Sequence, residues 1–321
     1  MVSSPFDTLL GQSTGIELLL RAVDCNRIAP AYLFVGPAGV GRRLAAAAFA
    51  ELVLVHRSSV AENSQDIRRR IHQRNHPDLL WVEPTYLHQG KRITPAEAAE
   101  LGIKRKSPPQ IRLEQIRELA RFLSRPPLEA QRSLVVIDQA ATMAEAAANG
   151  LLKTLEEPGQ ATLILLAPDT HTLLPTLVSR CQCVPFSRLD PDTMATVLQR
   201  TGHEDILAQP EILAIAQGSP GQAIASWQQH QAIPTDLLQD LAQPPQNLRQ
   251  ALDQARSIAK ELDTEAQLWL IDYLQHHYWQ QVQVQAIPWL ERLEQARRHL
   301  LGYGQPRLVW EVTLMDLVSG D

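Results

Sequence analysis

Residues 32 to 55 read Tyr-Leu-Phe-Val-Gly-Pro-Ala-Gly-Val-Gly-Arg-Arg-Leu-Ala-Ala-Ala-Ala-Phe-Ala-Glu-Leu-Val-Leu-Val. The apolar run at 32–35 predicts a short strand, and the Ala- and Leu-rich residues 42–55 predict a helix. A glycine-rich segment separates the two. Strand, glycine-rich loop and helix therefore follow in the order that a phosphate-binding loop requires.

This loop has the glycines of a phosphate-binding loop but lacks the two residues that bind the phosphates and the metal. A working loop reads G-x-x-x-x-G-K-[ST], in which the Lys contacts phosphates and the hydroxyl binds Mg²⁺. Here Arg42 and Arg43 occupy those two positions. A guanidinium can contact a phosphate as a planar fork, but it has no acceptor with which to ligate a metal. The backbone is predicted to remain able to curl around a phosphate at three glycines: Gly36, Gly39 and Gly41.

Apolar strand-like runs alternate with helical stretches up to Phe186. This alternation predicts a parallel sheet covered by helices on both faces, hence an α/β fold. The predicted strands after the first are 79–82, 133–138, 163–167 and 181–186, and the predicted helices are 112–123, 143–155 and 173–179. Residues 84–109 read as an insertion with a short helix at 95–101. After Phe186 the pattern is helical, in short stretches over 190–228 and in bundle-like stretches from 247 onward.

Composition is that of an ordinary globular protein. The chain has 321 residues, 45% of them apolar, and a net charge of −5. The length allows two or three domains, and the charge argues against a free-standing, non-specific nucleic-acid binder. Residues 1–30 do not resemble a signal peptide and no run of 18 apolar residues suggests a membrane span, so a cytoplasmic location without membrane contact is expected. Three cysteines make no disulfide framework, and Cys181 and Cys183 are expected to be buried on one face of a strand.

Three stretches are more specific: Val135-Val-Ile-Asp-Gln-Ala140, the run from Ala146 to Pro158, and the run from Leu173 to Cys181. They resemble the clamp-loader branch of the AAA+ superfamily, and most closely the delta-prime family of bacterial DNA polymerase III. Asn75-His-Pro-Asp78 and Gly218-Ser-Pro-Gly221 share this resemblance. It covers residues 1–228 strongly, and the C-terminal helices only by their composition and place.

The resemblance implies three domains. They are an AAA+ α/β domain over residues 1–187, a small helical lid domain over 188–230, and an all-α collar domain over 231–321. It also implies partners, namely gamma/tau ATPase and delta subunits in a hetero-pentameric ring. Such a ring opens a sliding clamp and places it on primer–template DNA.

The resemblance also assigns the positions around the nucleotide. Asp138 matches the Walker B Asp, but the next position, a Glu in working ATPases, is Gln139. A neutral amide cannot accept a proton near neutral pH, so general-base help is lost. Gly221 stands where hydrolysing relatives carry an Arg that touches the γ-phosphate. Together with Arg42 and Arg43, these losses predict a subunit with no catalytic residue in cis that uses neither ATP nor Mg²⁺.

Ser179-Arg180-Cys181, by contrast, is intact. In the resembling family this Arg reaches from the subunit edge into the ATP site of a neighbour. A guanidinium entering in trans neutralises charge on the transferred phosphoryl group, which raises rates by roughly 10³ to 10⁵ in comparable enzymes. We therefore expect Arg180 to be an arginine finger. The alternative is a surface Arg at a helix C-terminus.

A zinc module, which many delta-prime subunits carry, is not expected here. Residues 51–78 contain no cysteine and only three histidines without regular metal spacing: His56, His72 and His76. Structural zinc prefers thiolates, so no metal site is predicted. Arg68, Arg69 and Arg70, together with Arg74, are expected on a solvated helix face paired with Glu62 and Asp66. Lys104-Arg105-Lys106 is read as a solvated loop, and Trp269, Trp279, Trp289 and Trp310 as collar core or subunit interface.

Two other functions remain open. An active AAA+ motor of the same machine would need Lys and Ser/Thr in the loop, a Glu after Asp138 and an Arg near 221, and all are missing. A subunit that senses nucleotide without cleaving it is the second alternative, because loop amides and a helix N-terminus still favour an anion.

Overall fold

The computed structural model describes residues 4–55, 64–101, 108–302 and 304–319. The chain divides between Thr193 and Met194 into two compact units. Within the described ranges no helix is long and apolar enough to cross a lipid bilayer.

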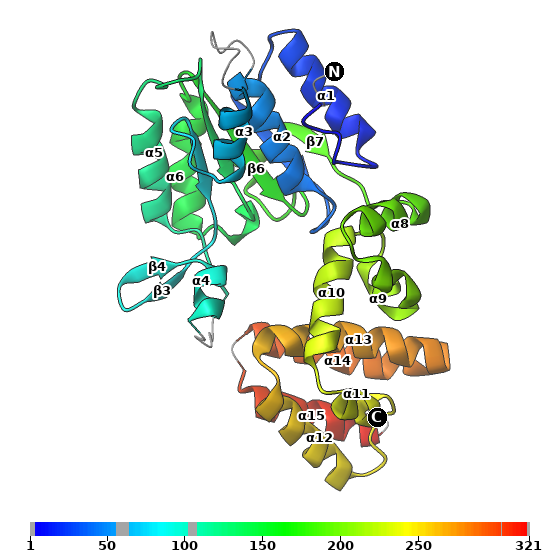
Figure 1. Cartoon of the computed structure of the whole chain (residues 1–321). Coiled ribbons are helices and arrows are strands. Elements are labelled where there is room, and N and C mark those ends of the chain that lie inside the picture. The colour runs from blue at the N-terminus through cyan, green and yellow to red at the C-terminus, as the bar shows by residue number, and fades with distance from the viewer. Residues whose placement is uncertain (1–3, 56–63, 102–107, 303, 320–321) are drawn as a thin grey trace. The chain divides into compact units, whose positions relative to one another are not determined.

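The N-terminal unit is built on a five-stranded sheet in the order β2-β5-β6-β1-β7 (Figure 1). All neighbouring strands are parallel. In the register, Leu33 lies opposite Leu165 on one side and Cys183 on the other. The strands are β1 Ala31–Val35, β2 Leu79–Val82, β5 Ser133–Ile137, β6 Ala161–Ala167 and β7 Gln182–Pro185.

Helices cover both faces of this sheet (Figure 1). Alternate strand residues point to opposite faces. Tyr32 and Phe34 therefore pack in one core with α1 Ser13–Asp24, α2 Arg42–Val55 and α3 Ser64–His72. Leu33 packs in the other core with α5 Leu113–Leu123, α6 Glu145–Glu156 and α7 Pro175–Val178. The predicted α/β class is confirmed, with element ends shifted by a few residues and a 3-10 turn at Ala140–Thr142 added before α6.

In the predicted insertion over 84–109, of which residues 84–101, 108 and 109 are described, the expected short helix is α4 Pro95–Glu100. The sequence did not predict the hairpin that precedes it, β3 Tyr86–His88 paired with β4 Lys91–Ile93. Its two turn residues, Gln89 and Gly90, both have positive φ (48° and 78°), as a two-residue hairpin turn requires. Three-residue strands are too short to show a two-residue hydrophobic period. The cluster Lys104-Arg105-Lys106 lies outside the described residues.

The second unit is helical throughout its described residues, as predicted. Asn247 and Asp263 cap α12 and α13 by accepting hydrogen bonds from backbone N–H groups. The helices are α8 Pro191–Arg200, which begins in the first unit, α9 Pro210–Ala216, α10 Pro220–Ala232, α11 Thr235–Leu241, α12 Leu248–Glu261, α13 Thr264–Val282, α14 Ile287–Leu301 and α15 Pro306–Ser319, with 3-10 turns η3 Glu204–Ala208 and η4 Gln283–Ala286.

Aromatic contacts join the lid region to the collar region in this unit. His230 on α10 lies 6.1 Å, between ring centroids, from both Trp269 and Tyr273 on α13. The boundary at residue 230 between the lid domain and the collar domain therefore stays a prediction. Trp269 and Trp310 are buried, as expected of core residues, whereas Trp279 is 41% exposed.

The cysteine prediction is wrong for Cys183, which is exposed, and Cys181 is only partly buried. The reason is the place of β7 at the edge of the sheet, where covering helices end. Cys181 precedes the strand, and burial there raises the pKa of its thiol to about 12. Cys25, at the end of α1, is also exposed.

The arginine prediction on α3 is partly wrong. Arg69 pairs with Asp66 as expected, and Glu62 lies outside the described residues. Arg68 Nε, however, lies 2.6 Å from Oε1 of the buried Glu51 on α2. Arg70 donates two hydrogen bonds of 2.9 Å to Glu129. These two side chains tie α3 to the rest of the unit, which helix periodicity alone does not reveal.

Asp78, at the end of the Asn75–Asp78 motif, is 2% exposed and anchors the loop before β5. Its carboxylate accepts three backbone N–H bonds of 2.7 to 2.8 Å, from Leu128, Glu129 and Ala130. The neighbouring His76 accepts a 3.1 Å bond from the Asp78 N–H at Nδ1. Burial is the main cause that lowers the pKa of His76.

Asp78→Ala should lower the free energy of unfolding by about 3 kcal/mol, because it leaves three N–H donors without their charged acceptor. Urea denaturation followed by circular dichroism measures this. The control is Asp24→Ala, at the exposed end of α1, which should change stability by less than about 0.5 kcal/mol. Equal effects of the two changes would contradict the anchoring role.

Candidate functional site

The glycine-rich loop between β1 and α2 adopts the tight turn that the sequence predicts. A Cβ at Gly36 would lie 2.1 Å from the Phe186 carbonyl oxygen, so only glycine fits there. Gly39 and Gly41 have φ of 77° and 105°, in the region that favours glycine. The helix α2 begins at Arg42, directly after this turn.

Arg43, in the first turn of α2, joins the ends of two neighbouring strands. Its Nη2 donates to Glu83 Oε1 at 2.5 Å, and its Nε lies 3.2 Å from Asp138 Oδ2. Glu83 follows β2, and Asp138 follows β5. Arg74 Nη1 donates to the same Glu83 oxygen at 2.7 Å. Two guanidinium groups and two carboxylates therefore meet at the carboxyl edge of the sheet.

Asp138 is 5% exposed, and this burial is the main cause that raises the pKa of its carboxyl. The positive charge of Arg43 acts against that rise. The Gln139 N–H also donates to Asp138 Oδ1 at 2.9 Å. A buried carboxylate needs an opposite charge or hydrogen bonds to stay ionised, and here Arg43 and the Gln139 amide supply them.

Arg42 lies beside this cluster and is partly buried. Its Nη1 is buried and has no hydrogen-bond partner among the residues that the structure describes. Burial lowers the pKa of this guanidinium, and the charge of Asp138 opposes that effect. Arg42 thus places positive charge next to the glycine-rich loop.

The residues present do not fit a magnesium–nucleotide group. A metal at this place would need a hydroxyl ligand at residue 43 and an accessible carboxylate at Asp138. Residue 43 instead offers a cation, and its Nε lies 3.2 Å from the Asp138 oxygen. A guanidinium and a divalent cation at one carboxylate oxygen repel each other.

The two remaining predicted positions lie in different units. Gln139 has φ 50° and lies next to Asp138, with its backbone in the cluster. Gly221 lies in the first turn of α10, in the second unit, after the N-cap Ser219.

Arg180 lies apart from this cluster, just after α7. Its Nη2 lies 2.8 Å from Glu156 Oε1, and its Nη1 donates to the Thr176 carbonyl at 3.0 Å. Its side chain is 38% exposed, and that of Glu156 is 54% exposed. The contact with Thr176 is the helix C-terminal contact expected of a surface Arg, and both partners lie within reach of solvent.

The histidines considered for zinc have other neighbours. His72 Nε2 lies 3.9 Å from Glu51, and His76 Nε2 lies 3.8 Å from Glu129. His56 is outside the described residues. No group of three or more His, Cys, Asp or Glu side chains suited to a metal occurs in the described part of the chain.

Sequence reasoning missed Glu83. A signal for Glu83 was available, because it directly follows the predicted strand 79–82, and parallel strands end at one edge of a sheet. The prediction for Arg74 is wrong, because this residue lies after the end of α3 and pairs with Glu83. It is brought in by packing of its guanidinium over the Trp81 ring, 4.8 Å from the centroid.

Two family profiles together match almost all of this chain. The profile described as DNA polymerase III, delta subunit, matches residues 11–190. The profile described as the C-terminal domain of cyanobacterial DNA polymerase III delta prime matches residues 192–317. The first match ends at residue 190 and the second begins at residue 192, close to the division of the two compact units between residues 193 and 194.

Two curated relatives are similar over part of their length. DNA polymerase III subunit delta' of Bacillus subtilis is 34% identical over 179 residues, which are 55% of this chain and 47% of the relative. The protein of the same name from Pseudomonas aeruginosa is 33% identical over 199 residues, which are 60% of this chain and 54% of the relative. The matches thus span about half the length of these relatives.

Among solved structures, a DNA polymerase III gamma subunit-related protein from Thermotoga maritima shares the fold. It aligns with a TM-score of 0.55 at 16% identity, over 95% of this chain and 99% of that protein. The α/β AAA+ fold with C-terminal helices, expected from the sequence, is confirmed.

Arg43→Met should raise the pKa of the Asp138 carboxyl further, because it removes the opposite charge and leaves the burial in place. A pH titration of the ¹³C-labelled aspartate carboxyl signals measures the shift. Arg21→Met is the control, since Arg21 pairs with Glu17 on the exposed surface of α1. An Asp138 pKa that does not move would show that the ion pair is absent in solution.

Proposed function

This chain belongs to the DNA polymerase III delta-prime family of clamp-loader proteins, and we propose that it is a subunit that does not hydrolyse ATP itself. Its part is to help load a sliding clamp on primed DNA and to lend Arg180 to a neighbouring ATPase subunit. ATP, Mg²⁺ and zinc are not used by this chain.

The observation that carries the first half of the proposal is the contact of Arg43 with Asp138 and Glu83. The carboxylate that would hold a metal through water is already neutralised by a cation from the chain itself. Replacement of a hydroxyl ligand by Arg43 therefore has two consequences. It removes one ligand, and it blocks access of a metal to another.

The chemistry of residues 139 and 221 supports the same conclusion. Gln139 cannot act as a general base near neutral pH, and Gly221 has no side chain to contact a γ-phosphate. Either loss alone would lower the rate of ATP hydrolysis. The loss at residue 139 affects activation of the attacking water, and the loss at residue 221 affects stabilisation of charge on the γ-phosphate. An active motor subunit is therefore not the function we propose.

The second half of the proposal rests on the exposure and weak tethering of Arg180. Its ion pair with Glu156 is solvent-accessible at both ends, and exposed pairs of this kind contribute about 0 to 1 kcal/mol. The guanidinium can leave that contact at little cost when a phosphate of a neighbouring subunit is offered. A bidentate fork suits this task better than a lysine ammonium does.

Partners follow from the family. Relatives of this chain carry the names DNA polymerase III subunit delta', tau and gamma/tau. We propose that the chain assembles with gamma/tau and delta subunits in a five-membered ring that acts on the clamp and on primer–template DNA. In such a ring Arg180 would act at the ATP site of a neighbouring subunit, which supplies the other residues of that site.

A second candidate function is that of a subunit that senses nucleotide without cleaving it. The shape of the loop at Gly36, Gly39 and Gly41 favours it, as does the buried Nη1 of Arg42, which has no partner among the described residues. Both features attract an anion. A weak phosphate contact is compatible with the blocked Asp138, whereas a metal-dependent one is not.

The isolated chain should hydrolyse no ATP above background, and a fluorescent ATP analogue should show no saturable binding to it with or without Mg²⁺. The double change Arg42→Lys, Arg43→Thr should introduce Mg²⁺-dependent binding, because it frees Asp138 and supplies a hydroxyl. It should not introduce hydrolysis, because Gln139 and Gly221 remain. Fluorescence titration and phosphate-release assays measure the two properties.

Saturable binding of the analogue by the unmodified chain without Mg²⁺, weakened by Arg42→Ala, would favour the sensing function, and Mg²⁺-dependent binding would contradict the blocked state of Asp138. Hydrolysis by the unmodified chain, purified free of motor subunits, would refute the proposal altogether. Arg21→Lys is a control variant, because it changes an exposed arginine on α1 that lies outside the loop cluster.

Arg180→Ala should leave folding and assembly of the reconstituted clamp loader almost unchanged and should lower its DNA-stimulated ATP hydrolysis. The loss at the one neighbouring site should be on the order of 10³-fold, and partial in the whole complex if other subunits carry fingers of their own. Arg180→Lys should rescue poorly. Steady-state ATPase and clamp-loading assays give the rates.

Glu156→Gln is the matched control, since it breaks the same surface ion pair and keeps the arginine. It should leave hydrolysis at the unmodified rate. If both variants behave alike, Arg180 serves only its own subunit and the finger role is wrong.

A further inference from the structure

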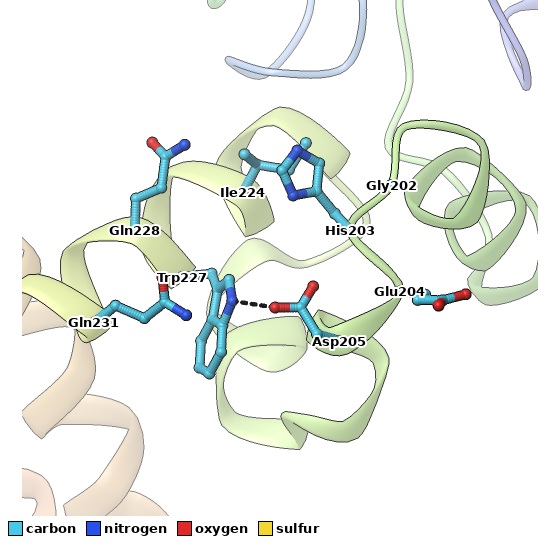
Figure 2. A pocket seen from close by; sticks show the side chains of 8 residues that line it. All are labelled: Gly202, His203, Glu204, Asp205, Ile224, Trp227, Gln228 and Gln231. Atoms are coloured by element: carbon cyan, nitrogen blue, oxygen red, sulfur yellow. Dashed lines mark hydrogen bonds between the residues drawn. The ribbon is translucent and has the colours of Figure 1, made fainter.

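A pocket in the second unit is lined by side chains of a different kind from those around Arg43, Glu83 and Asp138 (Figure 2). It lies between the η3 turn and α10, with a volume of about 400 Å³. Its lining is formed by eight residues: Gly202, His203, Glu204, Asp205, Ile224, Trp227, Gln228 and Gln231. A volume of this size suits a side chain or a small ligand.

The centre of the pocket is an indole that is held in place. Trp227 Nε1 donates to Asp205 Oδ2 at 2.6 Å, the dashed line of Figure 2. His230 stacks on Trp227 with ring centroids 5.4 Å apart and planes 15° apart, and it is not among the lining residues. The indole is therefore supported from outside the pocket and presents the rest of its surface to it. Since two neighbours fix its orientation, little side-chain entropy remains to be lost on binding.

The charge of the pocket is negative. Asp205 uses one oxygen for the indole. Glu204 lies at the rim, pointing away from the indole (Figure 2), and forms no hydrogen bond or ion pair within the part of the chain that the structure describes. Among the described residues no Lys or Arg lines the pocket, and Gln228 and Gln231 offer neutral amides at the other side. A phosphate would meet the two carboxylates with His203 as its one basic neighbour among the lining residues, which argues against nucleic acid.

We propose that this pocket binds an arginine side chain presented by a basic segment of a partner protein. A guanidinium can lie against the indole and donate to Asp205 at the same time. Arginine is favoured over lysine because its planar, weakly hydrated head stacks on aromatic rings. The amide oxygens of Gln228 and Gln231 can accept its remaining N–H groups. Glu204 adds a longer-range attraction that mainly raises the rate of association.

The proposal concerns a surface of the second unit and holds whether or not Arg180 acts as a finger. It is tested on the full chain with a short capped peptide that contains one arginine in a glycine–serine background. The readout is the indole N–H signal of Trp227 in ¹⁵N-edited spectra, assigned with Trp227→Phe. The arginine peptide should shift this signal in a saturable manner at a fixed low salt concentration.

Matched peptides and variants separate the contributions. A citrulline peptide, equal in shape and uncharged, should bind at least about tenfold more weakly. Asp205→Asn, which still accepts from the indole, should weaken the arginine peptide about tenfold, and Glu204→Gln about twofold. Glu291→Gln on α14 changes the net charge equally, lies outside the pocket, and should have no effect.

Three outcomes would overturn the proposal. The first is the absence of a saturable shift with the arginine peptide at millimolar concentration. The second is equal weakening by Glu291→Gln, which would indicate general electrostatic attraction. The third is equal or tighter binding of spermine or free guanidinium, which would make the occupant a small cation and exclude a protein segment.

Discussion

Burial of the parallel sheet on both faces is the constraint on which the first unit depends. Every residue of β5 and β6 is buried, so all their backbone groups must bond along the sheet and each face must be covered by helices. Parallel strands then end at one edge. The loops after β1, β2 and β5 therefore share one edge, where Arg43 in the first turn of α2 reaches Glu83 and Asp138. The fold brings these groups to one edge whether or not they bind a nucleotide.

Within that architecture, Asp138 poses an electrostatic problem that Arg43 solves. A carboxylate that is 5% exposed is unfavourable without a nearby positive charge. In a working site of this kind a hydrated metal supplies it. Here the guanidinium of Arg43 does, at 3.2 Å from the carboxylate, and Glu83 balances the added charge. Arg43 stands where a working loop has a hydroxyl, and its guanidinium supplies the positive charge that the buried Asp138 needs.

Charge pairs of the same kind hold α3. Arg68 reaches the buried Glu51, and Arg70 forms a two-pronged contact with Glu129 in the loop that Asp78 also anchors. These pairs hold α3 against its neighbours. The second unit also contains ion pairs, such as Arg297 with Asp272 at 2.6 Å. Buried polar contacts add to them, such as Trp310 Nε1 donating to the buried Gln267 at 3.0 Å.

The sequence by itself determined the elements whose signal is local. The strand-loop-helix order, the apolar strands, the missing Lys and hydroxyl at Arg42 and Arg43, and the family resemblance could all be read from neighbouring residues, and the comparisons confirm the fold and the family. Tertiary structure decided which polar side chains meet: Arg43 with Asp138, Arg74 with Glu83, Arg70 with Glu129, and Asp205 with Trp227. It also exposed Cys183, because only the strand order shows β7 to be an edge. The physical reason is range: hydrophobic period and turn chemistry act over a few residues, whereas an ion pair depends on distances that only the packed chain sets.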